Sequence, residues 1–224
     1  MSEERQRTET RHSALPRRRL TAAERLPQIL EAALEEFAEN GFGGASMAGA
    51  AARAGVAKGL IYHYFPGKAE LFAAVVRSCV QPLFDEAERL VADHSGSPTA
   101  LLRRLVELGY ARIAAEEREA LMFKLLIAEA DRFPELAAFY RTEVLSRALA
   151  LAGAVVRAGV AVGEFRPDAA DEPGLAAVLL APITMAAVWR LMLGPAEAPS
   201  LDAMCRAHTA LVVNGLRSPQ RQPS

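Results

Sequence analysis

The segment from Ser46 to Lys68 constrains the fold of this chain most, because it contains two short helix-forming runs joined by a tight turn. Ser46 is a preferred N-cap for a helix over 47–54, Gly55 interrupts that helix, and a second short helix is predicted over 57–64. Small side chains allow the two helices to pack closely at a steep angle: Ala50, Ala54 and Val56. This pattern predicts a helix-turn-helix, which leaves one face of the second helix free to enter a major groove.

The free face of the second helix combines groups that suit a phosphate backbone. Lysine neutralises a phosphate, glycine lets a backbone N–H approach closely, and hydroxyl or imidazole groups donate hydrogen bonds to phosphate oxygens. The residues that supply these groups, and that we predict to hold DNA, are Lys58, Gly59, Tyr62, His63, Tyr64 and Lys68. For Tyr62 and Tyr64 a place in the core is the open alternative, and Phe65, which has no polar tip, is assigned to the core.

The run AGVAKGLIYHYFPGKAEL resembles the DNA-binding domain of the TetR family of transcriptional regulators, whose usual form is close to AGVSKGTLYHHFPSKEEL. The similarity continues upstream through QILEAALEEFAENGFGGAS, so that it spans residues 21–76. The resemblance implies that DNA is held at these positions: Ser46, Lys58, Gly59, Tyr62, His63, Tyr64 and Lys68. Two departures matter. Ala57 lacks the hydroxyl of the serine that is common there, and Leu60 stands where threonine or serine is common and can contact thymine methyl groups.

The net charge of −1 is unevenly distributed along the chain. Residues 1–68 carry ten Lys or Arg against eight Asp or Glu, and the remaining residues carry sixteen against nineteen. The first residues concentrate the positive charge: Arg5, Arg7, Arg11, Arg17, Arg18 and Arg19. We expect residues 1–20 to form a disordered basic arm, which either follows the DNA or is a solvated tail.

The DNA-binding domain is predicted over residues 21–68, as three helices. Its first helix has an apolar row with helical spacing: Leu26, Ile29, Leu30, Ala33, Leu34 and Phe37. Thr21 and Glu24 form a capping box, but Pro27 would then lie in the second turn, so this helix either bends near Leu26 or starts late. Gly41 is expected to end it.

The rest of the chain is also helical in pattern. Helices are predicted over 68–92 with a kink at Pro82, then over 98–115 with Ser97 as N-cap, and also over 117–130, 134–162, 173–189 and 201–216. No alternating run indicates a strand. The prediction is therefore an all-α fold: an N-terminal three-helix DNA-binding domain, then a helical effector-binding and dimerisation domain over 69–216 and a disordered tail over 217–224.

The run PGLAAVLLAPITMAAVW, from Pro173 to Trp189, is the most hydrophobic part of the chain. It is short for a membrane span, contains Pro182 and ends at Arg190, so a buried helix is predicted and no membrane contact. A short recognition helix reads few base pairs, which favours two copies on paired half-sites. The resemblance implies a homodimer formed by this helix and the last one, although packing within one subunit stays an alternative.

The C-terminal part is larger than an interface requires, and the resemblance implies that it binds a small-molecule effector. The large side chains predicted to line its pocket are Phe123, Phe139, Tyr140, Met185 and Trp189, with an ordinary core role as the alternative for each. We expect an apolar or amphipathic effector that releases a repressor from a palindromic double-stranded DNA operator.

Other functions lack their motifs in this sequence. It has no Gly-rich phosphate loop, no HExxH and no CxxC, and its four histidines lack metal-ligand spacing. We therefore expect no enzyme, cofactor or metal. Cys79 and Cys205 show no disulfide pattern, which favours the cytoplasm. The alternatives are a helical small-molecule or protein-binding module without operator binding, or an enzyme.

Overall fold

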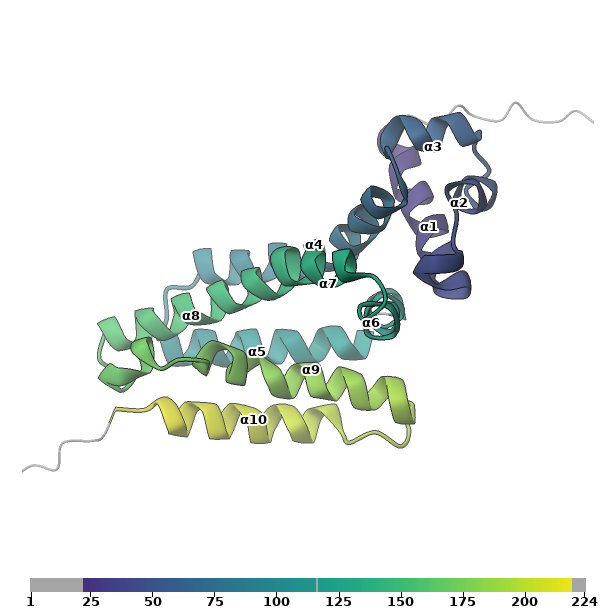
Figure 1. The fold of residues 1–224 in the computed structure, drawn as a ribbon. Coiled ribbons are helices and arrows are strands. Elements are labelled where there is room, and N and C mark those ends of the chain that lie inside the picture. The colour runs from purple at the N-terminus through teal and green to yellow at the C-terminus, as the bar shows by residue number, and fades with distance from the viewer. Residues whose placement is uncertain (1–21, 116, 219–224) are drawn as a thin grey trace, which may run out of the picture.

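The computed structural model describes residues 22–115 and 117–218, and all regular elements in these ranges are helices (Figure 1). The predicted all-α fold class is confirmed. The predicted arm, Thr21 and the last residues of the predicted tail lie outside the described residues. The elements are α1 (Ala22–Gly44), α2 (Met47–Arg53), α3 (Lys58–Tyr64), α4 (Lys68–Ala92), α5 (Pro98–Ala115), α6 (Glu117–Glu129), α7 (Pro134–Tyr140), the π-helix η1 (Arg141–Leu145), α8 (Ser146–Ala161), the 3₁₀-helix η2 (Pro167–Asp171), α9 (Leu175–Leu193) and α10 (Leu201–Leu216).

The helices form a small head and a longer body that α4 connects. Figure 1 shows α1, α2 and α3 grouped at one end, and α4 leads from them into the body formed by the later helices. Within the body, α5 packs against α8 and α10, and α8 packs against α9. Helix α6 packs on both α1 and α4, so it contacts the head directly.

The apolar row of α1 forms the core of the head, as its spacing predicts. Phe37 and Phe72 meet edge to face with ring centroids 5.2 Å apart, and Phe42 meets Phe72 with centroids 5.3 Å apart. Edge-to-face contacts between aromatic rings are favourable beyond the area they bury. Because Phe72 belongs to α4, these rings join the head to the connecting helix. The buried members of the row are Ile29, Leu30, Ala33, Leu34 and Phe37.

Helix α1 continues through Pro27, and its backbone stays helical around Leu26. The helix already exists at Ala22, so the predicted late start is wrong. Among its described residues only Gly41 has a non-helical backbone, with φ 65° and ψ 171°. Positive φ favours glycine, which has no Cβ to clash with the carbonyl. The helix predicted to end at Gly41 is interrupted there, and helical residues then continue to Gly44.

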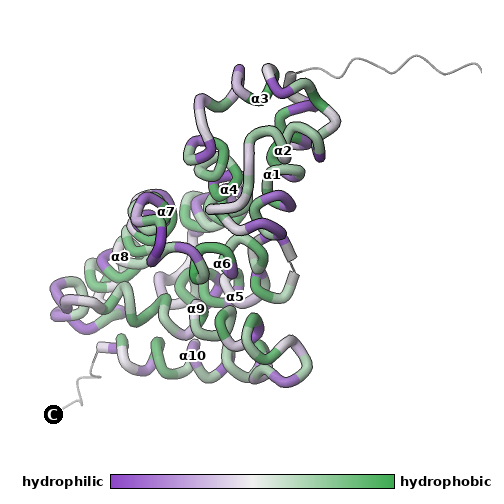
Figure 2. Tube along the Cα trace, turned by 45° about the vertical axis from the view of Figure 1, so that its right-hand side comes forward, coloured by the Kyte–Doolittle hydropathy of each residue, from purple (hydrophilic) through white to green (hydrophobic). Residues whose placement is uncertain are grey.

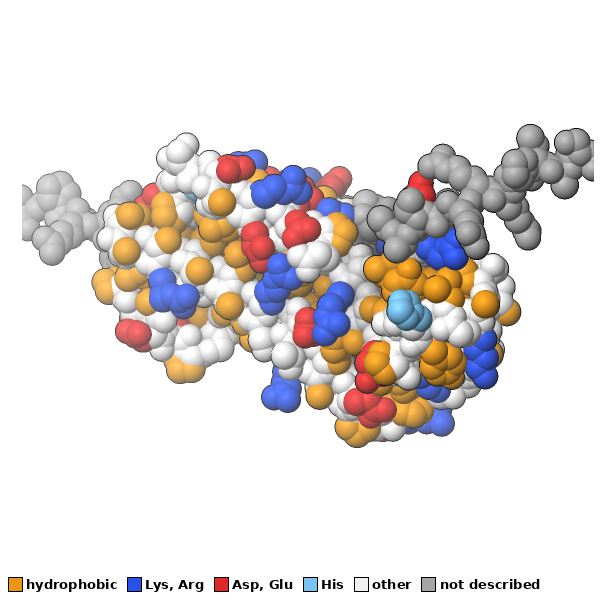
Figure 3. Space-filling view, turned by 90° about the horizontal axis from the view of Figure 1, so that it is seen from above, with side chains coloured by type: hydrophobic (Ala, Val, Ile, Leu, Met, Phe, Trp, Pro, Cys, Tyr) orange, Lys and Arg blue, Asp and Glu red, His pale blue; other side chains and the backbone are white. Residues whose placement is uncertain are grey.

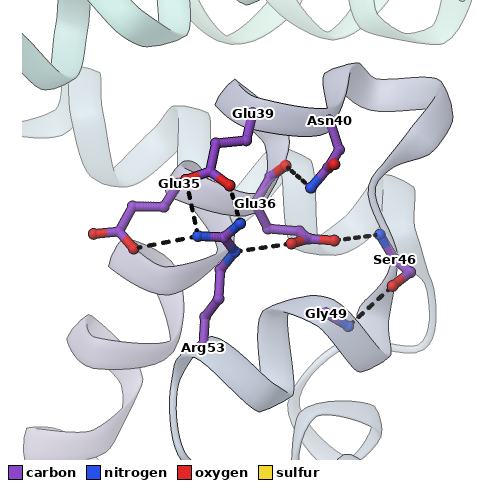
Figure 4. Close-up of polar contacts among 7 residues, drawn as sticks. All are labelled: Glu35, Glu36, Glu39, Asn40, Ser46, Gly49 and Arg53. Atoms are coloured by element: carbon purple, nitrogen blue, oxygen red, sulfur yellow. Dashed lines mark hydrogen bonds and ion pairs between the residues drawn. The ribbon is translucent and has the colours of Figure 1, made fainter.

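The buried carboxylate of Glu36 fastens both ends of α2 to α1 (Figure 4). Glu36 is 7% exposed; it accepts hydrogen bonds from the Ser46 N–H at 3.2 Å and from Arg53 Nε at 2.9 Å. Arg53 also pairs with Glu39 and lies 4.0 Å from Glu35. The hydrogen bond from Arg53 lowers the pKa of Glu39, and the hydrogen bonds to Glu39 and Glu36 raise the pKa of Arg53.

In the body, the predicted cap at Ser97 is present, and one predicted helix is interrupted by a π-helical turn. Ser97 Oγ accepts a hydrogen bond from the Ala100 N–H at 3.2 Å, so it caps α5 as expected. The single helix predicted over 134–162 is interrupted by the wider π-helical turn η1, which lies between α7 and α8. The core where α5, α8, α9 and α10 meet contains Leu101, Leu102, Val155, Val156, Phe165, Leu179 and Leu216.

Helix α9 differs most from its expected surroundings. The sequence predicts a buried helix, yet in a single chain α9 buries only Leu179 and Ala186. Figure 2 shows hydrophobic residues along most of its length. The prediction of burial is wrong for one copy because α9 lies in an outer layer of the body. Its neighbours α5, α8 and α10 leave part of its surface uncovered.

Gly49 tests the Glu36 contact, because a Cβ at this position would overlap the Glu36 carboxylate. Although alanine is the better helix former, we expect Gly49→Ala to lower the free energy of unfolding by about 1–3 kcal/mol. A Cβ at Gly215 in α10 meets nothing within 4 Å, so Gly215→Ala should instead be neutral or stabilising by up to about 1 kcal/mol. Urea denaturation measures both; a Gly49→Ala protein as stable as the Gly215→Ala protein would contradict the contact.

His208 should make the stability of the body sensitive to acid. Its ring is buried and lies beside Tyr110, with centroids 5.9 Å apart. Burial lowers the pKa of His208, so the unfolded chain binds a proton at higher pH than the folded protein does. The free energy of unfolding should therefore decrease as pH falls through about 6.5. We expect His208→Leu to reduce this decrease, measured by denaturation at pH values on both sides of it. An identical decrease in both proteins would exclude His208 as a source.

Candidate nucleic-acid interface and effector cavity

Helix α3 presents one polar face to solvent and anchors the other in the head. Ile61 and Phe65, one turn apart, are buried, and Phe65 thereby has the core position expected of it. The exposed side carries Lys58, Gly59, Tyr62 and His63, whereas Leu60 and Tyr64 are half-buried. Tyr62 is 46% exposed, and Lys58 Nζ lies over its ring, 5.8 Å from the centroid. A cation and hydroxyl beside an exposed glycine are groups that can contact phosphate.

Ser46 and Lys68 have structural contacts at positions predicted to hold DNA. Ser46 Oγ accepts a hydrogen bond from the Gly49 N–H at 2.9 Å and so caps α2. Lys68 Nζ donates to the carbonyl oxygens of Gly43 at 3.0 Å and Ala45 at 3.1 Å. It also lies 4.9 Å from the centroid of the Phe42 ring. Lys68 therefore stabilises the end of α1, and its contact with phosphate stays a prediction.

The α3 end of the molecule combines apolar and charged side chains. Seen from above, the head shows a histidine with apolar, basic and acidic side chains around it, and acidic and basic side chains are also mixed over the body (Figure 3). Arg53 of the head is already paired with Glu36 and Glu39. The charge offered by α3 itself is therefore that of Lys58, which has no ion pair with any described residue.

The body encloses a cavity of about 610 Å³, partly open to solvent, between α4, α5, α6, α7, η1 and α9. A volume of this size suits a drug-sized ligand. Of the predicted pocket residues, Phe123 and Tyr140 line it, with ring centroids 6.5 Å apart. Burial raises the pKa of Tyr140. The lining residues are Val80, Leu83, Gly109, Arg112, Ile113, Ala114, Ala120, Met122, Phe123, Tyr140, Val144, Ile183, Thr184, Ala187, Arg190, Leu191 and Pro195.

The other three predicted pocket residues lie outside this cavity. Phe139 packs instead under Arg77, whose guanidinium carbon is 5.0 Å from its ring centroid. Met185 and Trp189 are exposed on α9. Sequence reasoning missed the two arginines of the cavity wall, Arg112 and Arg190. The one available signal was that Arg190 directly follows the most hydrophobic run of the chain.

Two profiles of known protein families match the chain along most of its length. The family described as bacterial regulatory proteins, tetR family, matches residues 29–75, which include the helix-turn-helix. The AefR-like transcriptional repressor C-terminal domain matches residues 100–213, which include most of the body. The chain belongs to the TetR family of transcriptional regulators. It is therefore a ligand-responsive DNA-binding transcriptional repressor and not an enzyme.

Individual relatives agree with this membership. The HTH-type transcriptional repressor KstR2 of Rhodococcus jostii is 29% identical over 200 residues, which cover 87% of this chain and 92% of that protein. The HTH-type transcriptional regulator BetI of Pseudomonas aeruginosa is 40% identical over 84 residues, 37% of this chain and 43% of BetI.

Solved structures share the fold of this TetR-family chain. A transcriptional regulator from Pseudomonas aeruginosa superposes with a TM-score of 0.73 at 20% identity, covering 88% of this chain and 92% of that one. The regulator FadR from Bacillus subtilis, solved in complex with stearoyl-CoA, superposes with a TM-score of 0.65 at 20% identity, covering 86% of this chain and 100% of that one.

Substitution of Lys58 and substitution of Lys68 should have different effects on DNA binding and on stability. We expect Lys58→Ala to reduce the magnitude of the slope of log K against log salt by about one per subunit, with unchanged thermal stability. Lys68→Ala should instead cost about 1.5–3 kcal/mol of stability, since it removes charged hydrogen bonds. Salt titrations of DNA binding and thermal denaturation measure the two effects. An unchanged slope for Lys58→Ala would remove Lys58 from the phosphate contacts, and the slope for Lys68→Ala decides its own phosphate contact.

Proposed function

We propose that this TetR-family protein binds a palindromic operator as a homodimer, with one α3 in each of two major-groove half-sites. In this proposal residues 21–68 read DNA, and residues 69–216 dimerise and bind the effector, which is a small apolar or amphipathic molecule. The exposed face of α3 carries the proposal, because Lys58, Gly59, Tyr62 and His63 all lie on it. Leu60, at the edge of this face, is proposed to contact thymine methyl groups.

The uncovered face of α9 and the adjoining face of α10 support the proposed homodimer. Large apolar residues on α9 are exposed along one side: Val178, Met185, Trp189 and Met192. On α10, Leu211 is 75% exposed, and the exposed residues of this helix include three alanines: Ala203, Ala207 and Ala210. Contiguous exposed apolar surface marks an interaction site, and small residues let a second helix approach closely. A second copy related by two-fold symmetry would cover both faces.

Two helical segments of the described chain are long and apolar enough to cross a membrane, Pro134–Ala161 and Leu175–Leu193. The first carries charged side chains paired within the body, since Arg147 binds Glu88 at 2.6 Å and Glu143 binds Arg77 at 3.1 Å. The second contains Pro182 and is the proposed dimer helix. We therefore place the protein in the cytoplasm and no segment in a membrane.

A contact between α6 and α1 supports coupling of the cavity to the head. Met122 and Phe123 of α6 line the cavity. Just after α6, Phe133 packs on Phe42 of the head, with centroids 4.9 Å apart. The Glu129 carboxylate lies against Gly41, where α1 bends. An effector that displaces α6 would therefore shift the head, and it releases DNA only if it binds the released conformation more tightly.

Val178 tests the proposed dimer interface, because Val162 at the end of α8 offers a matched control. Each side chain is 64% exposed in a single chain. We expect Val178→Glu to shift the protein to monomers and weaken operator binding at least about tenfold, since each new carboxylate would be buried in the proposed interface without a partner. Val162→Glu should leave both unchanged. Light scattering after size exclusion measures the oligomer, and a dimeric Val178→Glu protein would exclude this interface.

Selection of bound fragments from a random or genomic DNA pool tests the proposed function as a whole. We expect an enriched two-fold-symmetric site whose affinity falls with salt. Leu60→Ala, selected in parallel, should change the preference at one base pair per half-site while other positions stay the same. A folded, dimeric protein that enriches no sequence without added ligand would contradict operator binding by the free protein.

A further inference from the structure

The described wall of the effector cavity carries positive charge and no negative charge. Among its lining residues the ionisable groups are Arg112, Arg190 and the phenol of Tyr140, and none is an aspartate or glutamate. The remaining wall is apolar apart from Thr184, whose hydroxyl donates to the Leu180 carbonyl of its own helix at 3.3 Å. A ligand inside would therefore meet an apolar surface and two guanidinium groups.

The two arginines differ in how their charge is balanced. Arg112 is held by Glu86, with Nη2 and Oε2 2.8 Å apart. Arg190 is half-buried, and its guanidinium forms no hydrogen bond or ion pair with any described residue. This contrasts with other arginines that contact carboxylates at short range: Arg53, Arg77, Arg118 and Arg147. Arg190 thus brings an unbalanced cation to the cavity.

The position of Arg190 on α9 directs it toward the ligand space. It shares one helix face with Ile183, Ala187 and Leu191, which follow the three- and four-residue spacing of a helix and also line the cavity. A half-buried guanidinium has lost hydrogen bonds to water. The two oxygens of a carboxylate or phosphate can replace them by accepting two parallel hydrogen bonds. The rings of Phe123 and Tyr140 supply apolar surface on the wall formed by α6 and α7.

We propose that the effector is an amphipathic anion, with an apolar body between α5, α6 and α9 and an acidic head group bound by Arg190. This inference rests on the proposed function only in calling the ligand an effector. A free fatty-acid-like carboxylate and an acyl thioester with phosphate groups share this chemistry, and the cavity is partly open to solvent, so its wall does not enclose the ligand completely.

Direct ligand binding to the full-length protein tests this proposal without DNA. The probes are octanoate, dodecanoate and hexadecanoate, their neutral primary amides, the matching alkyltrimethylammonium ions and dodecanoyl-CoA, measured by calorimetry. We expect at least one acid or the thioester to bind about ten- to a hundredfold more tightly than the matched amide, and the cation to bind most weakly. A tighter Kd for dodecanoyl-CoA than for dodecanoate identifies the thioester as the source of the anion.

Substitution of Arg190 separates a ligand contact from a role in packing. Arg190→Gln should remove most of the preference for acid over amide while amide binding changes little, and Arg190→Lys should keep part of it. Arg157→Gln is the matched control, since Arg157 is exposed on α8 outside the cavity. If Arg190→Gln does not fold, the comparison of acid, amide and cation on the unsubstituted protein decides.

Three outcomes would overturn the amphipathic-anion proposal: equal affinity for acid and amide, equal loss of both in Arg190→Gln, or binding of none of the probes. Operator selection without ligand is measured separately, so the two proposals fail independently. A protein that binds its operator but prefers the amide contradicts only the anionic ligand. A protein that binds the acid through Arg190 but enriches no DNA contradicts only the operator.

Discussion

The hydrogen bonds of one buried carboxylate set the geometry on which DNA reading by this protein depends. Helix α3 has seven residues, too few to be stable alone. It packs on α2, which in turn packs on α1, so the packing of α2 on α1 determines the orientation of α3. Glu36 fixes that packing by accepting from Ser46 at the start of α2 and from Arg53 at its end. A buried carboxylate that loses either partner is costly, so the arrangement resists sliding of α2 along α1.

The ends of most helices could be predicted from the sequence because local chemistry determines them. Ser46, Ser97 and Ser200 all cap helices through backbone N–H groups, and those helices begin where the sequence indicates. The partners of Glu36 and Lys68 could not be predicted. Glu36 is one of several glutamates on α1, and Lys68 reaches the end of α1 only after α4 packs on it. Such long-range contacts leave no periodic pattern in the sequence.

Only part of the predicted cavity lining is correct, and the errors on α9 have a particular reason. Phe123 and Tyr140 line the cavity, while Met185 and Trp189 lie on the opposite side of α9 from Ile183 and Ala187. An amphipathic helix reveals its inner face by its polar residues. Because α9 is apolar all round, its sequence does not distinguish the side facing the cavity from the side facing outward. Only the packing on α5, α8 and α10 distinguishes them.

Helix α9 consequently lies between the cavity, on one of its faces, and the partner subunit of the proposed dimer, on the other. A ligand that turns or shifts α9 must also change the surface that the partner packs against. Binding at the two cavities is then thermodynamically linked, and linkage of this kind is reciprocal. Positive linkage would make the loss of DNA binding a steeper function of effector concentration than saturation of one independent site, giving the repressor a threshold.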